Sequence, residues 1–271
     1  MKYQEFTPTG RLSAYVQCIY LFESDQLTGV DDIVFPGGSM EVIFNLGSGV
    51  WKTASQGLYR PTPVIELWGQ LTKPLPIRSE GKNQMLGVRF YTHAITSFFR
   101  EEIWELNDQV CNAIDFFGKS IYHLHERLLD TPLLTHRIDL VEQYLLSRLR
   151  QSKGPGIKTN LVGQIIRELQ SDVLCEDIQS IASRYALSPR YLQTLFLRYT
   201  GVTPKVYHKL NRFQRSLKLV TRHEVSLTSI AYECGYFDQS HFIREFRSFT
   251  GLTPSDFLAE SFPVSVALSN G

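Results

Sequence analysis

Residues 230–254 read IAYECGYFDQSHFIREFRSFTGLTP and residues 181–204 read IASRYALSPRYLQTLFLRYTGVTP, so the chain contains one segment twice, with one residue inserted in the second copy. Each copy opens with Ile-Ala, passes through a turn and ends in Thr-Gly-x-Thr-Pro. Each also carries two apolar residues four positions apart, Leu192 with Phe196 and Phe242 with Phe246. A short helix, a turn and a second helix, repeated in this way, predict two helix-turn-helix units.

Local signals mark the turn of each unit. In the first copy, Ser188 is a good helix N-cap and Pro189 a good first helical residue. In the second copy, Gly235 permits a left-handed turn and Asp238 can cap the helix that follows. A long helix from Pro204 to Thr221 is expected to connect the two units.

Charge is distributed unevenly along the chain. The whole sequence has a net charge of only +1, but residues 1–156 carry −2 and residues 157–271 carry +3. Between Ile178 and His223 there are nine Lys and Arg residues and no acidic residue. A solvated helix face normally mixes both signs, so this stretch favours contact with the phosphate backbone of a nucleic acid over simple helix packing.

Residues 158–260 resemble the DNA-binding domain of the AraC/XylS family of transcription regulators. That resemblance rests on the two helix-turn-helix units, the connecting helix and the signature of the second unit. The signature residues are Ala231, Gly235-Tyr236, Ser240-His241-Phe242, Phe246 and Gly251-Leu252-Thr253-Pro254. The resemblance implies a sequence-specific DNA-binding regulator of transcription, with RNA polymerase as a further partner if it is an activator.

The second helix of each unit is expected to enter the major groove, where its N-terminal residues read base edges. In the first unit the residues not needed for packing are Arg190, Gln193 and Thr194, and the matching residues of the second unit are Gln239, Ser240 and Arg244. Phosphate contacts are expected from Arg198, Lys205, Arg212 or Arg215, and Arg247. His241 is expected either to face the DNA backbone or to pack between helices.

The connecting helix is expected to hold the two reading helices about one DNA turn, roughly 34 Å, apart. One chain would then read two successive segments of the major groove, on one face of the duplex. The expected target is an asymmetric site, and a homodimer would need two such sites.

The first half of the chain predicts a sheet followed by helices. Residues 3–91 read as short strands separated by turns, with alternation over 40–46. Region 3–150 resembles the sensor domain of a subgroup of the same regulators, through residues 35–45 and 86–90. The resemblance implies a cupin-like β-barrel, so the expected fold class is α+β, a cupin-like barrel or sandwich with following helices plus an all-α domain with two helix-turn-helix units.

Helices are predicted over 93–99, 112–130 and 133–150. The last of these carries an apolar stripe, Leu134, Ile138, Val141, Leu145 and Leu149, which is compatible with a dimerisation helix or with packing on its own barrel. The expected domains are 1–150 and 158–260, with a Pro- and Gly-containing linker over 151–157 and a tail over 261–271.

A small barrel joined to a DNA-binding domain is expected to act as a sensor of a small-molecule effector. The candidate pocket residues are aromatic or cationic, although packing is the more common role for each of them: Trp51, Tyr59, Trp68, Arg89 and Tyr91. The barrel strands contain no H-x-H pattern, so we expect no enzyme, no metal and no cofactor. The alternative is a constitutive DNA-binding regulator whose first domain only dimerises. A DNA-repair methyl acceptor is disfavoured because it needs clustered cysteines.

Composition is that of an ordinary globular protein, with 43% hydrophobic and 20% charged residues. The first residues lack the pattern of a secretory signal and no apolar run is long enough to span a membrane, so a cytoplasmic protein without a membrane partner is expected. Four widely spaced cysteines, Cys18, Cys111, Cys175 and Cys234, predict reduced thiols.

Overall fold

The first part of the chain folds into an eight-stranded sheet in which every recorded strand pair is antiparallel. The computed structural model describes residues 1–271 apart from 56, 100–101, 152–155, 172–177, 223–224 and 263–271. The main strand order is β1-β2-β7-β3-β6-β8, and β4 pairs with β5 and β7. The strands are β1 (Lys2–Phe6), β2 (Val16–Val34), β3 (Met40–Asn45), β4 (Val50–Ser55), β5 (Leu58–Pro61), β6 (Ile65–Trp68), β7 (Leu75–Phe90) and β8 (Val110–Asn112).

Alternation along the strands sends neighbouring side chains to opposite faces of the sheet. On β3, Met40, Val42 and Phe44 enter the larger core, which we call the helix-covered core. Between them, Glu41 and Ile43 point to the other face, which we call the hollow face. Both faces are therefore buried along β3, where the sequence predicted a half-buried strand.

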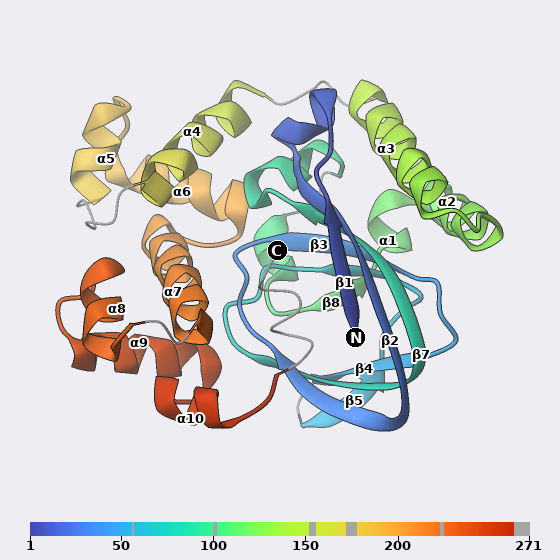
Figure 1. The fold of residues 1–271 in the computed structure, drawn as a ribbon. Coiled ribbons are helices and arrows are strands. Elements are labelled where there is room, and N and C mark those ends of the chain that lie inside the picture. Colours follow the sequence, from blue (N-terminus) through green and yellow to red (C-terminus); the bar gives the residue numbers. More distant parts are fainter. Residues whose placement is uncertain (56, 100–101, 152–155, 172–177, 223–224, 263–271) are drawn as a thin grey trace.

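Helices and 3-10 turns cover the first of these faces. The helix-covered core contains apolar residues of the sheet together with residues of the covering elements. Figure 1 places α2 and α3 on the opposite side of the sheet domain from the helices that follow them. The covering elements are η1 (Gly10–Ala14), η2 (Thr92–Ser97), η3 (Ile103–Leu106), α1 (Ile114–Phe117), α2 (Lys119–Asp130) and α3 (Leu134–Gln151).

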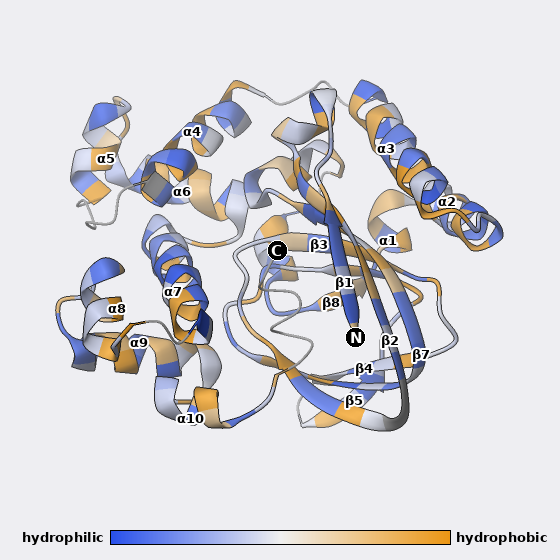
Figure 2. Cartoon of the chain, viewed as in Figure 1, coloured by the Kyte–Doolittle hydropathy of each residue, from blue (hydrophilic) through white to orange (hydrophobic). Residues whose placement is uncertain are grey.

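The apolar stripe of α3 packs on its own domain. Val141, Leu145 and Leu149 are buried in the helix-covered core, and Leu134 and Ile138 pack against it partly buried. Figure 2 shows the apolar and polar residues alternating along α2 and α3, as expected for helices with one buried face. The structure thus decides the open alternative for this stripe in favour of intramolecular packing.

The predicted single helix over 112–130 is wrong. Residues 110–112 form β8 by pairing with β6, and Gly118 adopts a positive φ of 71° that separates α1 from α2. The predicted helix over 93–99 is instead the 3-10 segment η2. Both errors come from short segments whose state is set by tertiary contacts and not by local periodicity.

The second part of the chain is helical and has two small cores. One core joins α4, α5 and α6, and the other joins α7, α8, α9 and α10. This arrangement of a sheet domain and a helical domain confirms the predicted α+β class (Figure 1). The helices are α4 (Ile157–Ser171), α5 (Ile178–Arg184), α6 (Pro189–Thr200), α7 (Pro204–Arg222), α8 (Leu227–Glu233), α9 (Gln239–Thr250) and α10 (Pro254–Ala259).

Both helix-turn-helix units form as predicted. The Ser188 side chain accepts a hydrogen bond from the Tyr191 backbone N–H at the start of α6. The Asp238 side chain accepts one from the His241 backbone N–H, at 2.6 Å, at the start of α9. Gly235, in the second turn, has a φ of 73°, the left-handed conformation expected for it.

The linker predicted over 151–157 falls mostly outside the described residues, since α3 ends at Gln151 and α4 begins at Ile157. The tail predicted over 261–271 lies outside them from residue 263 onward. Phe262, however, is buried against Phe257, so the helical domain extends at least to this residue. None of the described helices is long and apolar enough to cross a membrane. Cys18, Cys111 and Cys234 are free thiols, and Cys175 lies outside the described residues.

Candidate nucleic-acid interface and adjoining pocket

The first reading helix, α6, divides its residues between core and solvent. Leu192 and Phe196 are fully buried, whereas Arg190, Gln193 and Thr194 are exposed. The Thr194 hydroxyl donates a hydrogen bond to the Arg190 carbonyl within the helix, at 3.0 Å. The three predicted base-facing residues therefore lie together on one exposed face near the N-terminus of α6.

The second reading helix, α9, has the same division. Phe242 and Phe246 have no exposed surface, while Ser240 and Arg244 are exposed. Gln239 is half-buried because its side-chain carbonyl accepts a hydrogen bond from the Thr228 hydroxyl of α8, at 2.7 Å. This contact fixes the orientation of the Gln239 amide, so its NH2 group remains available to donate a hydrogen bond to another molecule.

His241 is half-buried and packs against the turn that precedes α9. Its ring meets the Tyr236 ring edge-on, with centroids 5.4 Å apart, and its Nδ1 accepts a hydrogen bond from the Phe237 backbone N–H. Of the two roles open for His241, the structure therefore favours packing. The Phe237 side chain beside it is 86% exposed, a feature that the apolar periodicity gave no reason to expect.

Four of the five predicted phosphate contacts lie at the surface. Arg198, Lys205 and Arg247 are exposed and Arg215 is half-exposed. Arg212 is buried, so the prediction is wrong for this residue.

The Arg212 side chain is buried in an ion pair between α7 and α9. Its Nε and Nη2 donate to the two carboxylate oxygens of Glu245, at 2.9 and 2.7 Å, and its guanidinium lies 4.3 Å from the centroid of the Tyr236 ring. Only 8% of the side chain is exposed. This bidentate pair fixes the packing of α9 on α7, so Arg212 is not free to contact a phosphate, and Arg215 is the accessible member of the predicted pair.

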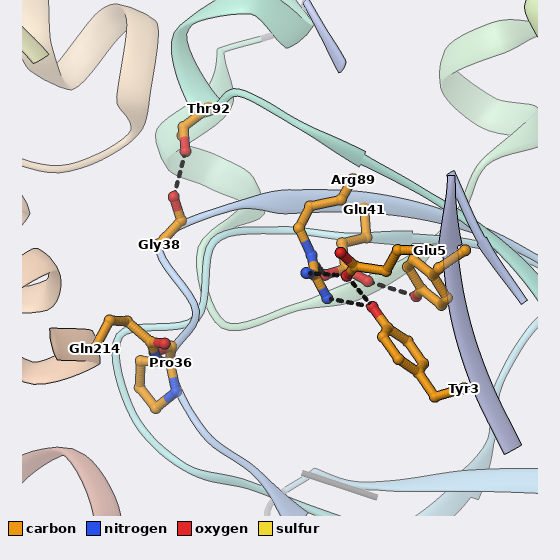
Figure 3. Close-up of polar contacts among 9 residues, drawn as sticks. Tyr3, Glu5, Pro36, Gly38, Glu41, Arg89, Thr92 and Gln214 are labelled. Carbon is orange, nitrogen blue, oxygen red and sulfur yellow. Dashed lines mark hydrogen bonds and ion pairs between the residues drawn. The ribbon is translucent and has the colours of Figure 1, made fainter. Parts of the chain in front are cut away.

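Among the described residues, hydrogen bonds anchor the helical domain on the sheet domain at two points, in addition to the packing of α4 and α6 against η2 and η3. At the first, Asn107 Nδ2, after η3, donates to the Gly201 carbonyl at the end of α6, at 2.6 Å. At the second, the Gln214 side chain of α7 donates to the Pro36 carbonyl, as Figure 3 shows. Phe35, next to Pro36, is buried in the core of α7 to α10, where its ring lies 5.4 Å from that of Phe257.

Between these anchors lies a cavity of about 270 Å³, bounded by the hollow face of the sheet and by the helical domain. Strands β2, β3, β4, β6 and β7 form one wall and α7 forms much of the other. The lining residues of the sheet include Tyr20, Phe22, Glu41, Ile43, Trp51, Glu66, Trp68 and Arg89, and those of α7 are Tyr207, Leu210, Asn211, Gln214 and Lys218.

Among the predicted pocket residues, Trp51, Trp68 and Arg89 line this cavity. Tyr59 and Tyr91 do not line the cavity, so the prediction is wrong for both residues. Tyr59 is on β5 at the surface, where the Arg78 guanidinium lies 4.6 Å from its ring centroid. Tyr91 packs against the helix-covered core, on the other side of the sheet.

Arg89 is held by two carboxylates at the wall of the cavity. Its Nε donates to Glu41, at 2.8 Å, and its Nη1 donates to Glu5, at 3.1 Å (Figure 3). The Tyr20 hydroxyl donates to the second Glu41 oxygen, at 2.5 Å. Tyr20 can lie flat here because its strand partner is Gly87, where a Cβ atom would sit 2.0 Å from the Tyr20 ring.

Glu66 of β6 is a fully buried carboxyl at the cavity wall. It accepts hydrogen bonds from the Thr62 hydroxyl and from the Trp68 indole N–H. Burial raises the pKa of Glu66 to about 7, in spite of these two donors, which lower it. Sequence reasoning missed this residue, although a single acid inside the apolar run Ile65–Trp68 was the available signal.

Two families match parts of this chain. Residues 181–260 match a helix-turn-helix domain, and residues 4–112 match a domain of unknown function (DUF6597). The second match covers the sheet domain through β8, and the first covers both reading helices.

The curated relatives are named as HTH-type transcriptional activators. The HTH-type transcriptional activator RhaS of Salmonella typhimurium (strain LT2) is 29% identical over 160 residues, which are 56% of this chain and 56% of that protein. RhaS of Salmonella typhi gives the same values. The chain thus spans about half the length of the curated relatives it matches.

Several solved structures are also similar to this chain, over different shares of its length. ToxT from Vibrio cholerae is 13% identical, with 89% of this chain and 97% of that chain covered and a TM-score of 0.47. A DNA-binding transcriptional dual regulator from Escherichia coli K-12 is 29% identical, with 36% and 95% covered and a TM-score of 0.32. A probable AraC family transcriptional regulator from Rhodopseudomonas palustris is 25% identical, with 38% and 99% covered and a TM-score of 0.34.

Proposed function

The chain belongs to the AraC/XylS family of transcription regulators, and from this premise we propose that it binds double-stranded DNA through α6 and α9 and is controlled by a small molecule in the cavity beside α7. The relatives are regulators and not enzymes, which supports a role without catalysis.

The DNA-binding part of the proposal rests on the exposed polar faces of the two reading helices. Arginine can bind guanine, and glutamine adenine, through paired hydrogen bonds worth roughly 1–3 kcal/mol of discrimination each. Arg190 with Gln193 on α6, and Arg244 with Gln239 on α9, supply both types in each unit. Exposed Arg198, on α6, and Lys205, on α7, add positive charge for the phosphate backbone.

The observation that carries the regulatory part is the double role of α7. Its residues Leu210, Phe213 and Leu217 fill the core of the second unit, and Tyr207 belongs to the core of the first. The same helix lines the cavity, with Leu210 and Tyr207 among the lining residues. A molecule in the cavity would therefore contact the helix that sets the distance between the two readers, which is a physical route for regulation.

The proposal includes two further partners, RNA polymerase and a second copy of the chain. The RhaS relatives are named transcriptional activators, which supports RNA polymerase as a partner of this chain. A homodimer remains compatible with the structure, although the α3 stripe is used within one chain. The alternative is a constitutive regulator whose sheet domain only dimerises.

A DNA-binding titration tests the first part. Host-genome fragments that bind the full chain would be selected, and their affinity measured by fluorescence anisotropy. Arg190→Ala and Arg244→Ala should each weaken binding by roughly 1–3 kcal/mol. The matched control is Arg127→Ala, which removes an exposed arginine of α2 far from the readers. Unchanged affinity in both reader variants would contradict the proposal.

Addition of a metabolite library to the same titration tests the second part. A compound that changes DNA affinity should lose its effect in Ile43→Trp, because the larger side chain fills the cavity. Val50→Trp, at a position 43% exposed on β4, is the control and should still respond. If no compound changes the affinity, the constitutive alternative is favoured.

A further inference from the structure

We propose that the cavity binds an organic cation, such as a substituted ammonium group, held between the two indole rings and the Glu66 carboxylate. This inference rests on the proposed function, because it assigns a chemical class to the effector of the same cavity.

Glu66 lies on the cavity side of β6. Strand alternation places Ile65 and Leu67 in the helix-covered core and turns Glu66 with Trp68 toward the cavity. Glu66 has no exposed surface, and each of its two oxygens accepts one hydrogen bond, from Thr62 and Trp68. Each carboxylate oxygen has two lone pairs, so acceptor capacity remains for a ligand.

Aromatic side chains line the same cavity as this carboxylate. Trp51 and Trp68 are 4% and 7% exposed and both line the cavity, together with Phe22, whose ring meets that of Trp51 edge-on with centroids 5.9 Å apart. Indole faces attract cations more strongly than other aromatic side chains do. The Trp51 Nε1 is buried without a hydrogen-bond partner among the described residues.

The charged residues that line the cavity are unevenly distributed between its two sides. Arg89 already donates to Glu41 and Glu5, so its positive charge is matched by more than one negative charge. The other cationic lining residue among those described is Lys218, which is exposed, on α7, at the side of the cavity away from the sheet. The sheet side of the cavity thus has an excess of negative charge, which an anionic ligand would have to overcome.

A buried carboxylate without a cation also has a cost that a cation would offset. That cost is visible in the pKa of Glu66, which burial raises to about 7. A cation within the cavity would stabilise the ionised carboxyl, and the same contact would increase the affinity of the protein for the cation.

Binding of three isosteric probes tests the proposal: choline, its neutral analogue 3,3-dimethylbutan-1-ol, and the anion 3,3-dimethylbutyrate. The readout is quenching of Trp51 and Trp68 fluorescence in full-length Trp104→Phe protein, because Trp104 is half-exposed on η3 and is not among the lining residues. Isothermal titration calorimetry gives an independent dissociation constant, and benzyltrimethylammonium serves as a larger cation.

The expected result is saturable binding of at least one of the two cations, with the neutral and anionic isosteres weaker by about tenfold or more, a difference of roughly 1.4 kcal/mol. Glu66→Gln should weaken cation binding by a similar factor while Glu126→Gln, which changes an exposed carboxylate of α2, should have no effect. Circular dichroism would verify that Glu66→Gln is folded.

Three results would overturn the proposal: no saturable binding of either cation, equal binding of the uncharged or anionic isostere, or equal binding by Glu66→Gln. Preferred binding of the anion would leave the cavity as an effector site and reject only the cation. DNA affinity of the same protein without any probe is measured separately, so a failure of DNA binding is distinguishable from a failure of this inference.

Discussion

Gln214 of α7 donates a hydrogen bond to the carbonyl oxygen of Pro36, in the loop between β2 and β3. Gln214 also lines the cavity, and Phe35, beside Pro36, is buried in the core of α7 to α10. The sheet domain and the second helix-turn-helix unit therefore share side chains of one core. A displacement of this loop would be transmitted to α9 through packed groups and not through a flexible connection.

The contribution of Phe35 can be measured directly. Phe35→Ala should destabilise the protein by about 3–5 kcal/mol, because it removes a buried aromatic side chain and leaves a cavity. Hydrogen exchange should increase in α7 to α10 more than in α4 to α6, whose core Phe35 does not enter. Leu58→Ala, at a side chain 63% exposed, is the control. An equal increase in both groups of helices would show that the shared core is not local to the second unit.

Arg212 and Arg215 should differ although they are one helical turn apart on α7. Arg212→Ala leaves the Glu245 carboxylate buried without its bidentate partner, so it should cost about 3–5 kcal/mol of unfolding free energy. Urea denaturation measures this loss, and the double variant Arg212→Ala with Glu245→Gln should recover part of it.

Arg215→Ala should instead leave stability nearly unchanged and lower the slope of log affinity against log salt concentration by about 1, as expected for one lost phosphate contact. DNA titrations at several salt concentrations measure this slope. A salt slope that falls in Arg212→Ala but not in Arg215→Ala would reverse the assignment.

The buried carboxyl of Glu66 predicts a pH dependence of stability. Its pKa is raised from 4.5 to about 7 by burial, so the folded protein retains a proton that the unfolded chain loses. The favourable contribution is complete below about pH 4.5 and is lost as the pH rises through about 7. At 1.36 kcal/mol per pKa unit, the loss is roughly 3 kcal/mol.

Glu66→Gln removes this dependence and keeps a side chain of the same size that can still accept from Trp68. The free energy of unfolding of the variant, relative to the natural chain, should therefore rise by roughly 2–3 kcal/mol between pH 5 and pH 8. Denaturation at both pH values measures the difference, in which the other titrating groups cancel. A difference that is independent of pH would mean that Glu66 is not buried as described.

The helix-turn-helix units were predictable because their signals are local. The Ser188 and Asp238 caps, Gly235 and the repeated Thr-Gly-x-Thr-Pro each act within a few residues of the chain, so they indicate a helix boundary in any context. The exposed positions of the readers followed from the apolar positions next to them. Local chemistry and helical period were sufficient for this half.

The features that sequence reasoning missed depend on distant partners. Arg212 is buried because Glu245, on another helix, lies against it, and helical period alone cannot distinguish it from Arg215. β8 forms because Val110–Asn112 pairs with β6, and a three-residue strand has almost no local signal. Glu66 and the α7 side of the cavity become neighbours only when the two domains pack together.

The central claim is that one chain reads two major-groove segments with a fixed spacing between α6 and α9. Its most direct test is the affinity of the full chain for a selected DNA site in which about five base pairs, half a helical turn, are inserted between the two contacted segments. The insertion moves one segment to the opposite face of the duplex. The affinity of the natural chain for the altered site should therefore fall to the affinity of the Arg244→Ala variant for the original site. The Arg244→Ala variant itself should lose little more affinity on the altered site. Equal affinity for the original and altered sites would contradict the claim.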